Sequence, residues 1–182
     1  MNASQPFDGS AATYDEMFSK RRLGIWLREM VWRHLPFEAG DHVLELGCGT
    51  GEDALTLAWH GIHVTATDVS TEMLAVAAAK IRAAEMTQWV ALERLDLNDL
   101  SRSPLSIGQT FDGVLANFGV VNCVEDRRAL AAFLAGNVRR DGAVALVVMG
   151  PLCPWEIGWH LLHFQPRRAR RRIKKRTLAH VG

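Results

Sequence analysis

The stretch that decides the fold of this chain is Val43-Leu44-Glu45-Leu46-Gly47-Cys48-Gly49-Thr50-Gly51-Glu52-Asp53-Ala54. It begins with an apolar run that is typical of a strand buried on both faces, and it ends in residues that favour a helix. Between them, three glycines at alternate positions let the backbone turn tightly and approach a ligand closely. The free N–H groups at the start of the helix would face that ligand. The stretch therefore predicts a site for a nucleotide-like cofactor.

Strands and helices alternate along the rest of the chain. Strands are predicted at residues 42–46, 62–67, 89–95, 111–116 and 143–149, and helices at 20–35, 52–60, 71–84 and 125–137. This order predicts an α/β fold with a Rossmann-like, doubly wound and mostly parallel sheet that carries helices on both faces. Ligands of such sheets bind at the carboxyl ends of the strands.

Three stretches are expected within a single domain. They are an N-terminal helical cap at 1–40, a cofactor-binding core at 41–150, and a Trp-rich and basic segment at 151–182. A turn is predicted at 140–142, just before the last strand. The helix at 20–35 is expected to bury the apolar face that its helical spacing creates. That face consists of Leu23, Leu27, Met30, Val31 and His34.

The composition is that of a soluble globular protein. Of the 182 residues, 48% are hydrophobic, and the first ten are polar and acidic, unlike a secretory signal. No apolar run nears the roughly 20 residues that span a bilayer. Three scattered cysteines argue against a disulfide framework and a zinc site, and they fit a reducing compartment. We therefore expect a cytoplasmic protein without a metal or a membrane span.

The glycine pattern separates two classes of cofactor. A dinucleotide fingerprint needs glycines at relative positions one, three and six, which are Gly47, Gly49 and Glu52 here. A glutamate at the third of these positions would repel a pyrophosphate. S-adenosylmethionine carries no phosphate. It offers an adenine, a ribose diol, a zwitterionic amino acid and a sulfonium, so an acidic residue in the turn is tolerable.

Two motifs carry a resemblance to a known family. The pattern hydrophobic-Glu45-hydrophobic-Gly47-x-Gly49-x-Gly51 resembles the first motif of the class I S-adenosylmethionine-dependent methyltransferases. The pairs at 7–8 and 14–15, Phe-Asp and Tyr-Asp, resemble the opening motif of small-molecule members of the quinone and malonyl-carrier types. The resemblance covers residues 7–150. It implies transfer of a methyl group from S-adenosylmethionine to a small-molecule acceptor by direct displacement, which leaves S-adenosylhomocysteine.

The resemblance also implies the residues that hold the cofactor. Asp68, at the end of the second strand, would accept both ribose hydroxyls, and its alternative role is to cap the next helix. Asp96, after the third strand, would accept from the adenine amino group, and the Leu97 N–H would meet a ring nitrogen. The full expected set is Tyr14, Glu45, Gly47, Cys48, Gly49, Thr50, Gly51, Asp68, Val69, Met73, Asp96, Leu97, Asn117 and Phe118.

The sequence leaves the methyl acceptor open. Family members that methylate amino groups of nucleic acid or glutamine carry Asn or Asp, two prolines and an aromatic residue after the fourth strand. Here the corresponding stretch is Asn117-Phe118-Gly119-Val120, which argues against those substrates. His160 and His163 are weak candidates for a general base, since two histidines on an amphipathic helix are equally typical of ordinary packing.

The end of the chain leaves several alternatives open. Residues 167–176 hold eight of the 21 Lys and Arg residues, as a solvated helix face or a contact to RNA or anionic lipid would. The run lacks the interleaved aromatics of single-strand binding surfaces, which argues against nucleic acid. The family usually adds two more strands, so we expect a C-terminally truncated chain or a sheet edge covered by a partner, for example in a homodimer. A non-catalytic cofactor-binding or interaction module and an NAD-dependent oxidoreductase remain the alternative functions.

Overall fold

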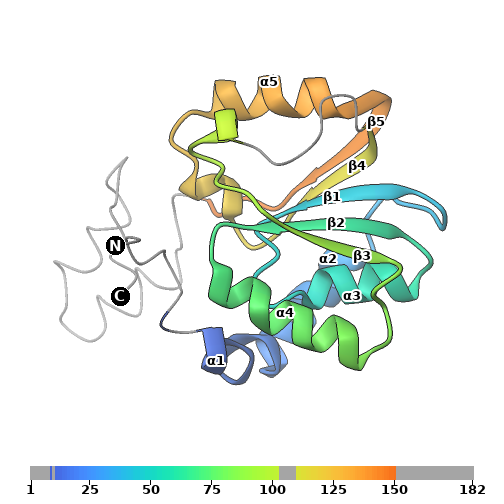
Figure 1. The fold of residues 1–182 in the computed structure, drawn as a ribbon, viewed down its shortest axis with the longest axis vertical. Coiled ribbons are helices and arrows are strands. Elements are labelled where there is room, and N and C mark those ends of the chain that lie inside the picture. The colour runs from blue at the N-terminus through green and yellow to red at the C-terminus, as the bar shows by residue number, and fades with distance from the viewer. Residues whose placement is uncertain (1–8, 10, 103–109, 151–182) are drawn as a thin grey trace, which may run out of the picture. The chain divides into compact units, whose positions relative to one another are not determined.

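The computed structural model describes residues 9, 11–102 and 110–150, and its elements lie in one compact unit, Met1–Val148 (Figure 1). Five parallel strands form a single sheet in the order β3-β2-β1-β4-β5. The strands are β1 (His42–Leu46), β2 (His63–Asp68), β3 (Val90–Arg94), β4 (Phe111–Ala116) and β5 (Val138–Leu146). The predicted α/β fold with a doubly wound parallel sheet is confirmed.

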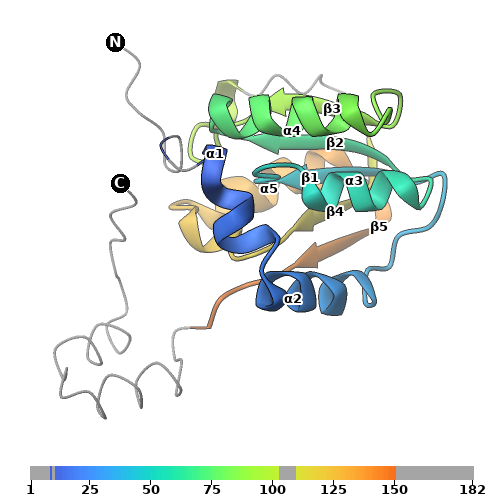
Figure 2. The ribbon, with the colours of Figure 1, turned by 90° about the horizontal axis from the view of Figure 1, so that it is seen from below.

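Helices cover both faces of the sheet. Figures 1 and 2 show α2, α3 and α4 on one face and α5 on the other. Within the described residues, the first two elements are α1 and a π-helical turn, η2, and two short 3₁₀ turns, η3 and η4, flank β4. The bounds are α1 (Ala11–Tyr14), η2 (Asp15–Ser19), α2 (Arg22–Trp32), α3 (Glu52–Trp59), α4 (Thr71–Ala83), η3 (Leu100–Arg102), η4 (Val120–Cys123) and α5 (Arg127–Asn137).

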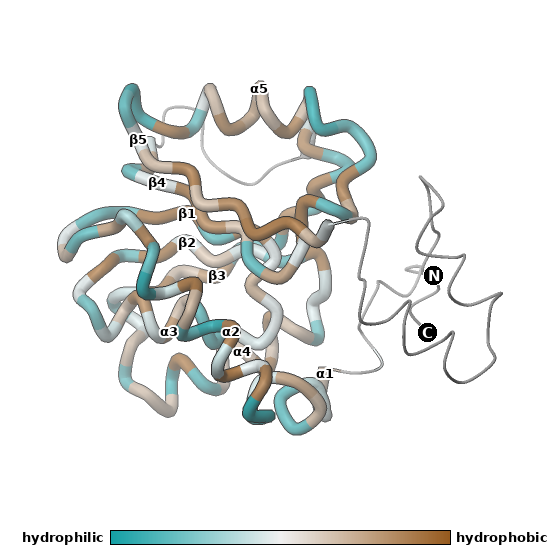
Figure 3. Tube along the Cα trace, turned by 180° about the vertical axis from the view of Figure 1, so that it is seen from behind, coloured by the Kyte–Doolittle hydropathy of each residue, from teal (hydrophilic) through white to brown (hydrophobic). Residues whose placement is uncertain are grey.

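The central strand β1 is buried on both faces, as its apolar run predicts. Val43 packs into the core beneath α3 and α4, whereas Leu44 and Leu46 pack into the core beneath α5. All three side chains are fully buried, and burial of each contributes about 1.5–3 kcal/mol. Figure 3 shows the hydrophobic segments gathered along the strands at the centre of the sheet. This core fixes the carboxyl end of β1, from which the glycine-rich loop leaves.

The predicted inward face of α2 is wrong at Leu23, Met30 and His34, which are exposed, whereas Leu27 and Val31 are half-buried. Leu23 is 64% exposed and Met30 is 41% exposed, while the helix buries Gly24 and Arg28 instead. A Cβ at position 24 would collide with the carbonyl oxygen of Phe18, so the missing side chain is what lets α2 approach the preceding turn. The helix is therefore oriented by a close backbone contact and by a buried charge rather than by its apolar spacing.

The predicted turn at 140–142 lies inside a strand. β5 begins at Val138, five residues before the predicted start, and Val138 is the register partner of Phe111. The register between β4 and β5 shifts between Phe111 and Gly113, and Asp141 has a positive φ of 66°. The turn signal at Asp141 and Gly142 therefore marks an irregularity within β5 rather than a break before it.

The predicted segment at 151–182 lies outside the described residues. This includes His160, His163 and the basic run at 167–176. Among the helices that the structure describes, none is long and apolar enough to cross a membrane.

Candidate cofactor site

The glycine-rich loop lies where the sheet order reverses, at the carboxyl end of β1 between β2 and β4, as ligand sites of such sheets do. Gly47, Gly49 and Gly51 all have positive φ angles, of 65°, 54° and 80°. A Cβ on Gly47 would lie 2.5 Å from Val120, and one on Gly51 would lie 3.0 Å from Ala77. A Cβ on Gly49 would meet no atom within 4 Å. The outer glycines thus permit packing, whereas the middle one faces open space that a ligand can fill.

Asp68 ties the end of β2 to this loop. Its Oδ2 accepts a hydrogen bond of 2.9 Å from the Gly49 N–H, and its Oδ1 accepts one of 2.9 Å from the Ser70 N–H. The alternative role of Asp68 as a helix cap is wrong, because Ser70 is the N-cap of α4 and its hydroxyl accepts from the Met73 N–H. Met73 is buried and Val69 is half-buried. The carboxylate of Asp68 therefore lies beside the open middle glycine.

The N-terminal cap is fastened to the loop by charged groups. The Thr50 hydroxyl donates a hydrogen bond of 2.6 Å to Asp15, and Lys80 forms ion pairs with both Asp15 and Glu52. Burial acts to raise the pKa of Asp15, but the hydrogen bonds from Lys80 and Thr50 outweigh it and lower the pKa below its ordinary value. Figure 2 shows α1 and the turn after it at the end of the sheet to which the arrowheads of β2 and β3 point.

A buried charged cluster that the sequence analysis missed lies next to the loop. Arg28 of α2 is 6% exposed and Asp53 of α3 is 4% exposed, and Arg28 Nε lies 3.3 Å from Asp53 Oδ1. Trp32 Nε1 donates to Asp53 Oδ1 at 2.8 Å, and Asn117 Nδ2 donates to Asp53 Oδ2 at 3.0 Å. One carboxylate thus joins α2, α3 and the end of β4. The available signal was an arginine within the apolar sequence of a helix.

Arg28 and Glu45 are among the buried residues whose side chains keep polar atoms without a hydrogen-bond partner within the described part of the chain. In Arg28 these atoms are Nη1 and Nε, which lies 3.3 Å from Asp53 as an ion pair, and in Glu45, which is 2% exposed, the atom is Oε2. Burial, followed by the charge of Asp53, raises the pKa of Glu45 well above its ordinary value. An unsatisfied buried polar group costs about 1–3 kcal/mol. A ligand that brings both an anionic and a cationic group would satisfy both residues.

Aromatic rings join the cap to the end of β4. Phe18 contacts Tyr14 at a centroid distance of 5.8 Å and meets Phe118 edge-on at 5.0 Å. The Arg28 guanidinium lies 4.7 Å from the centroid of the Phe118 ring. Phe118 has a positive φ of 49°, a backbone conformation that residues other than glycine rarely adopt. Its N–H donates to Asn117 Oδ1 at 2.8 Å. Burial raises the pKa of Tyr14. The predicted residues Tyr14, Asn117 and Phe118 therefore lie in one assembly with Arg28.

The remaining predicted residues lie around the same end of the sheet. Asp96 follows β3, two residues after Arg94, the register partner of Asp68. Its Oδ1 accepts from the Asn98 N–H at 2.9 Å, and Leu97 packs against the core beneath α5. Cys48 is buried in the loop, where burial and the charge of Glu45 raise the pKa of its thiol well above the ordinary value.

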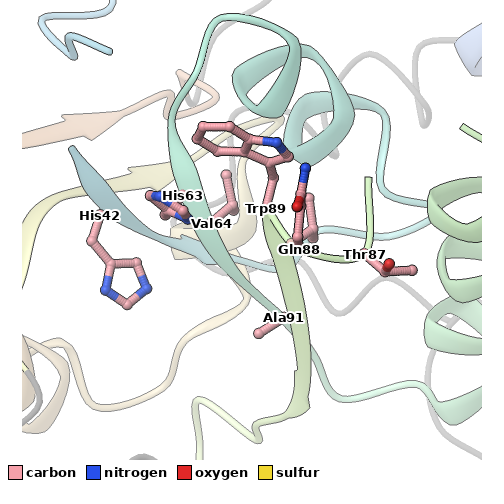
Figure 4. A pocket seen from close by; sticks show the side chains of 8 residues that line it. His42, His63, Val64, Thr87, Gln88, Trp89 and Ala91 are labelled. Carbon is pink, nitrogen blue, oxygen red and sulfur yellow. The ribbon is translucent and has the colours of Figure 1, made fainter. Parts of the chain in front are cut away.

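A separate pocket of about 280 Å³ lies at the opposite end of the sheet (Figure 4). His42 and His63 are the first residues of β1 and β2, and the His63 ring stacks on Trp89 with a centroid distance of 4.5 Å. This pocket lies at the amino ends of the strands, away from the glycine-rich loop. Among the described residues, no group of three or more His, Cys, Asp or Glu side chains is arranged to hold a metal ion.

Residues 43–142, which are more than half of the chain, match the family model of a methyltransferase domain. The chain belongs to the methyltransferase-domain family. The matched range of this chain runs from β1 to the irregularity within β5 and includes the glycine-rich loop, Asp68, Asp96 and Asn117. The resemblance to the class I S-adenosylmethionine-dependent methyltransferases is thereby confirmed.

Named relatives of this chain include methyltransferases whose names refer to quinones. The demethylmenaquinone methyltransferase of Clavibacter sepedonicus is 31% identical over 134 residues, which are 72% of this chain and 51% of the relative. The ubiquinone/menaquinone biosynthesis C-methyltransferase UbiE of Rubrivivax gelatinosus is 38% identical over 104 residues, 56% of this chain and 41% of the relative. A crystal structure of an S-adenosylmethionine-dependent methyltransferase from Mesorhizobium loti matches with 27% identity and a TM-score of 0.56, over 73% of this chain and 55% of that one. The chain thus spans about half the length of these relatives.

Proposed function

We propose that this domain binds S-adenosylmethionine at the glycine-rich loop and transfers its methyl group to a small-molecule acceptor. The observation that carries the proposal is a pair of buried side chains, Arg28 and Glu45, that keep polar atoms without a hydrogen-bond partner among the described residues. A guanidinium suits the carboxylate of the amino-acid end of the cofactor, and a carboxyl group suits its ammonium. A pyrophosphate would suit Arg28 alone and would leave Glu45 facing a like charge, which argues against a dinucleotide.

The other cofactor contacts of the proposal follow the strand ends. Asp68 would accept from the ribose hydroxyls while it keeps its bond to the Gly49 N–H, since a carboxylate has several lone pairs. Val69 and Met73 would pack on the adenine. Asp96 and the backbone N–H of Leu97 would meet its polar edge. These five contacts are expectations carried over from the resemblance.

The cofactor supplies an activated methyl group and a neutral leaving group when it is bound. The protein has to hold the acceptor in line with the methyl group, and such positioning can supply roughly 7–11 kcal/mol of the barrier. The Tyr14, Phe18 and Phe118 rings would exclude water from the carboxyl end of β4. The backbone at Asn117 and Phe118 would line the acceptor side. His160 and His163 remain weak candidates for a base.

The acceptor that we favour is a quinol-like small molecule. One relative is named a demethylmenaquinone methyltransferase and another a ubiquinone/menaquinone biosynthesis C-methyltransferase, and both names refer to molecules with a flat ring. The edge-on pair Phe18 and Phe118 offers an apolar aromatic surface beside the loop, against which a flat ring can pack.

The alternative candidate function is a cofactor-binding or interaction module without turnover. The two candidates differ in a single test. The protein is incubated with S-adenosylmethionine and a panel of quinols, small acids and amines, and S-adenosylhomocysteine is quantified. We expect acceptor-dependent product from the wild type and at least about tenfold less from Arg28→Met, because a charge-assisted contact of about 1.5–3 kcal/mol is lost. Cofactor binding without product from any acceptor would instead support the non-catalytic module.

A further inference from the structure

Asp53 is the meeting point of a buried network that the cofactor contacts alone do not explain. Its two oxygens accept from Trp32 and Asn117, at 2.8 and 3.0 Å, and Arg28 Nε lies at 3.3 Å. The three partners come from α2 and from the end of β4, whereas Asp53 itself is in the first turn of α3. A change at Asp53 therefore reaches the cap, the glycine-rich loop and the end of β4 together.

The ion pair with Asp53 balances the charge of Arg28 but leaves part of its hydrogen-bonding capacity unused. The hydrogen bonds to Asp53 come from Trp32 and Asn117, while Nε and Nη1 of Arg28 have no such partner among the described residues. A buried ion pair contributes little to stability compared with apolar packing of the same volume. A pair that is close, buried and left with free donors is better suited to hold a guanidinium ready for another anion.

The same contacts form a closed ring of four residues. Asp53 accepts from Asn117 Nδ2, and the N–H of Phe118 donates to Asn117 Oδ1. The Phe118 ring lies 4.7 Å from the Arg28 guanidinium, and the ion pair of Arg28 with Asp53 closes the ring. Phe118 keeps a positive φ of 49° within this ring, a conformation that persists only when its surroundings enforce it. The position of Arg28 is thus coupled to the backbone turn at the end of β4.

We propose that Asp53 is a positioning residue that holds the Arg28 guanidinium toward the amino-acid end of the cofactor and couples it, through Asn117, to the turn beside the methyl-transfer centre. This inference rests on the proposed function and deepens it. It makes Asp53 responsible for recognition of the cofactor carboxylate, although Asp53 does not itself touch the ligand. Loss of the Asp53 charge should therefore weaken the binding of only those ligands that carry the amino-acid group.

The test compares two ligands by calorimetry, S-adenosylhomocysteine and 5′-methylthioadenosine, which lacks the amino-acid end. We expect Asp53→Asn to weaken the binding of S-adenosylhomocysteine about tenfold, the equivalent of about 1.4 kcal/mol. The affinity for 5′-methylthioadenosine should change less than twofold. Asp112→Asn is the matched control, because Asp112 also pairs with an arginine, Arg139 at 3.0 Å, but lies near the amino end of β4. The control should bind both ligands as the wild type does.

A second pair of variants keeps the test valid if Asp53→Asn does not fold. Arg28→Met and the double variant Arg28→Met/Asp53→Asn leave no unpaired arginine behind, and removing both charges of a buried pair is tolerated better than removing one. In the Arg28→Met background, adding Asp53→Asn should lower the affinity for S-adenosylhomocysteine less than twofold. A further tenfold loss there, or equal weakening of both ligands by Asp53→Asn, would overturn the positioning role. Failure of the wild type to bind either ligand would instead refute the proposed function.

Discussion

The hydroxyl of Thr50 in the glycine-rich loop donates a hydrogen bond of 2.6 Å to Asp15 of the N-terminal cap. The two residues are 35 positions apart, and Lys80 of α4 also pairs with Asp15. The cap, the loop and α4 thus meet at one carboxylate at the carboxyl end of the sheet. The proposed cofactor has to bind beneath a cap that this carboxylate fastens.

Asp15→Asn should lower the melting temperature at pH 7. The pKa of Asp15 is lowered in the fold, so its contribution to stability is present above the unfolded value of 3.8 and is lost as the pH falls through the lower, folded value. The difference between wild type and variant should therefore shrink to nothing in acid. Thermal unfolding between pH 7 and pH 2 measures it, with Glu16→Gln, an exposed neighbour, as the control. Equal stability of Asp15→Asn and wild type at pH 7 would show that Asp15 does not fasten the cap.

Binding of the cofactor should release a proton from Glu45. Burial raises the pKa of Glu45 in the ligand-free fold, which favours its neutral form, whereas an ammonium group beside it favours the ionised form. Ligand binding therefore lowers this pKa. Titrations of S-adenosylhomocysteine at one pH, in two buffers of different ionisation enthalpy, measure the number of protons released.

Glu45→Gln is the matched variant for this proton. It has nearly the same shape and cannot ionise, so its observed binding heat should not depend on the buffer. A wild-type heat that is the same in both buffers would contradict the role of Glu45 at the ammonium group.

Gly47→Ala and Gly49→Ala should affect different properties. Both positions have positive φ, which costs a residue with a Cβ about 1–2 kcal/mol. At Gly47 the new methyl group would also lie 2.5 Å from Val120, so stability should fall further. At Gly49 the methyl group enters open space, so the larger loss should be in cofactor affinity. Melting temperatures and calorimetry of both variants check this. Wild-type affinity in Gly49→Ala would mean that the ligand does not lie against this glycine.

The sequence predicts the parts of the fold and of the site that local patterns encode. The strand at 42–46 is apolar on both faces, the glycines require a turn, and Asp68 closes an alternating β-branched strand, so each is visible within a short window. The buried face of the helix at 20–35 was predicted wrongly, because its apolar spacing favours burial of Leu23 and Met30. Gly24 instead permits a close backbone contact, which a hydropathy pattern does not reveal.

The Arg28 and Asp53 cluster was beyond local patterns for a different reason. Its members are joined by contacts over 21 to 64 positions of sequence, and only the tertiary fold shows that an arginine on α2 has a buried carboxylate to balance it. The start of β5 was also misplaced, because Asp141 and Gly142 carry a turn signal that the pairing with β4 accommodates as a local irregularity.

The central claim is that the glycine-rich loop and the strand end beside it hold S-adenosylmethionine. Calorimetric titration of the full chain with S-adenosylmethionine, for the wild type, Asp68→Ala and the control Asp112→Ala, tests it most directly. The account predicts saturable binding to one site in the wild type and in Asp112→Ala, and no measurable binding in Asp68→Ala. Absence of binding by the wild type, or wild-type affinity in Asp68→Ala, would contradict it.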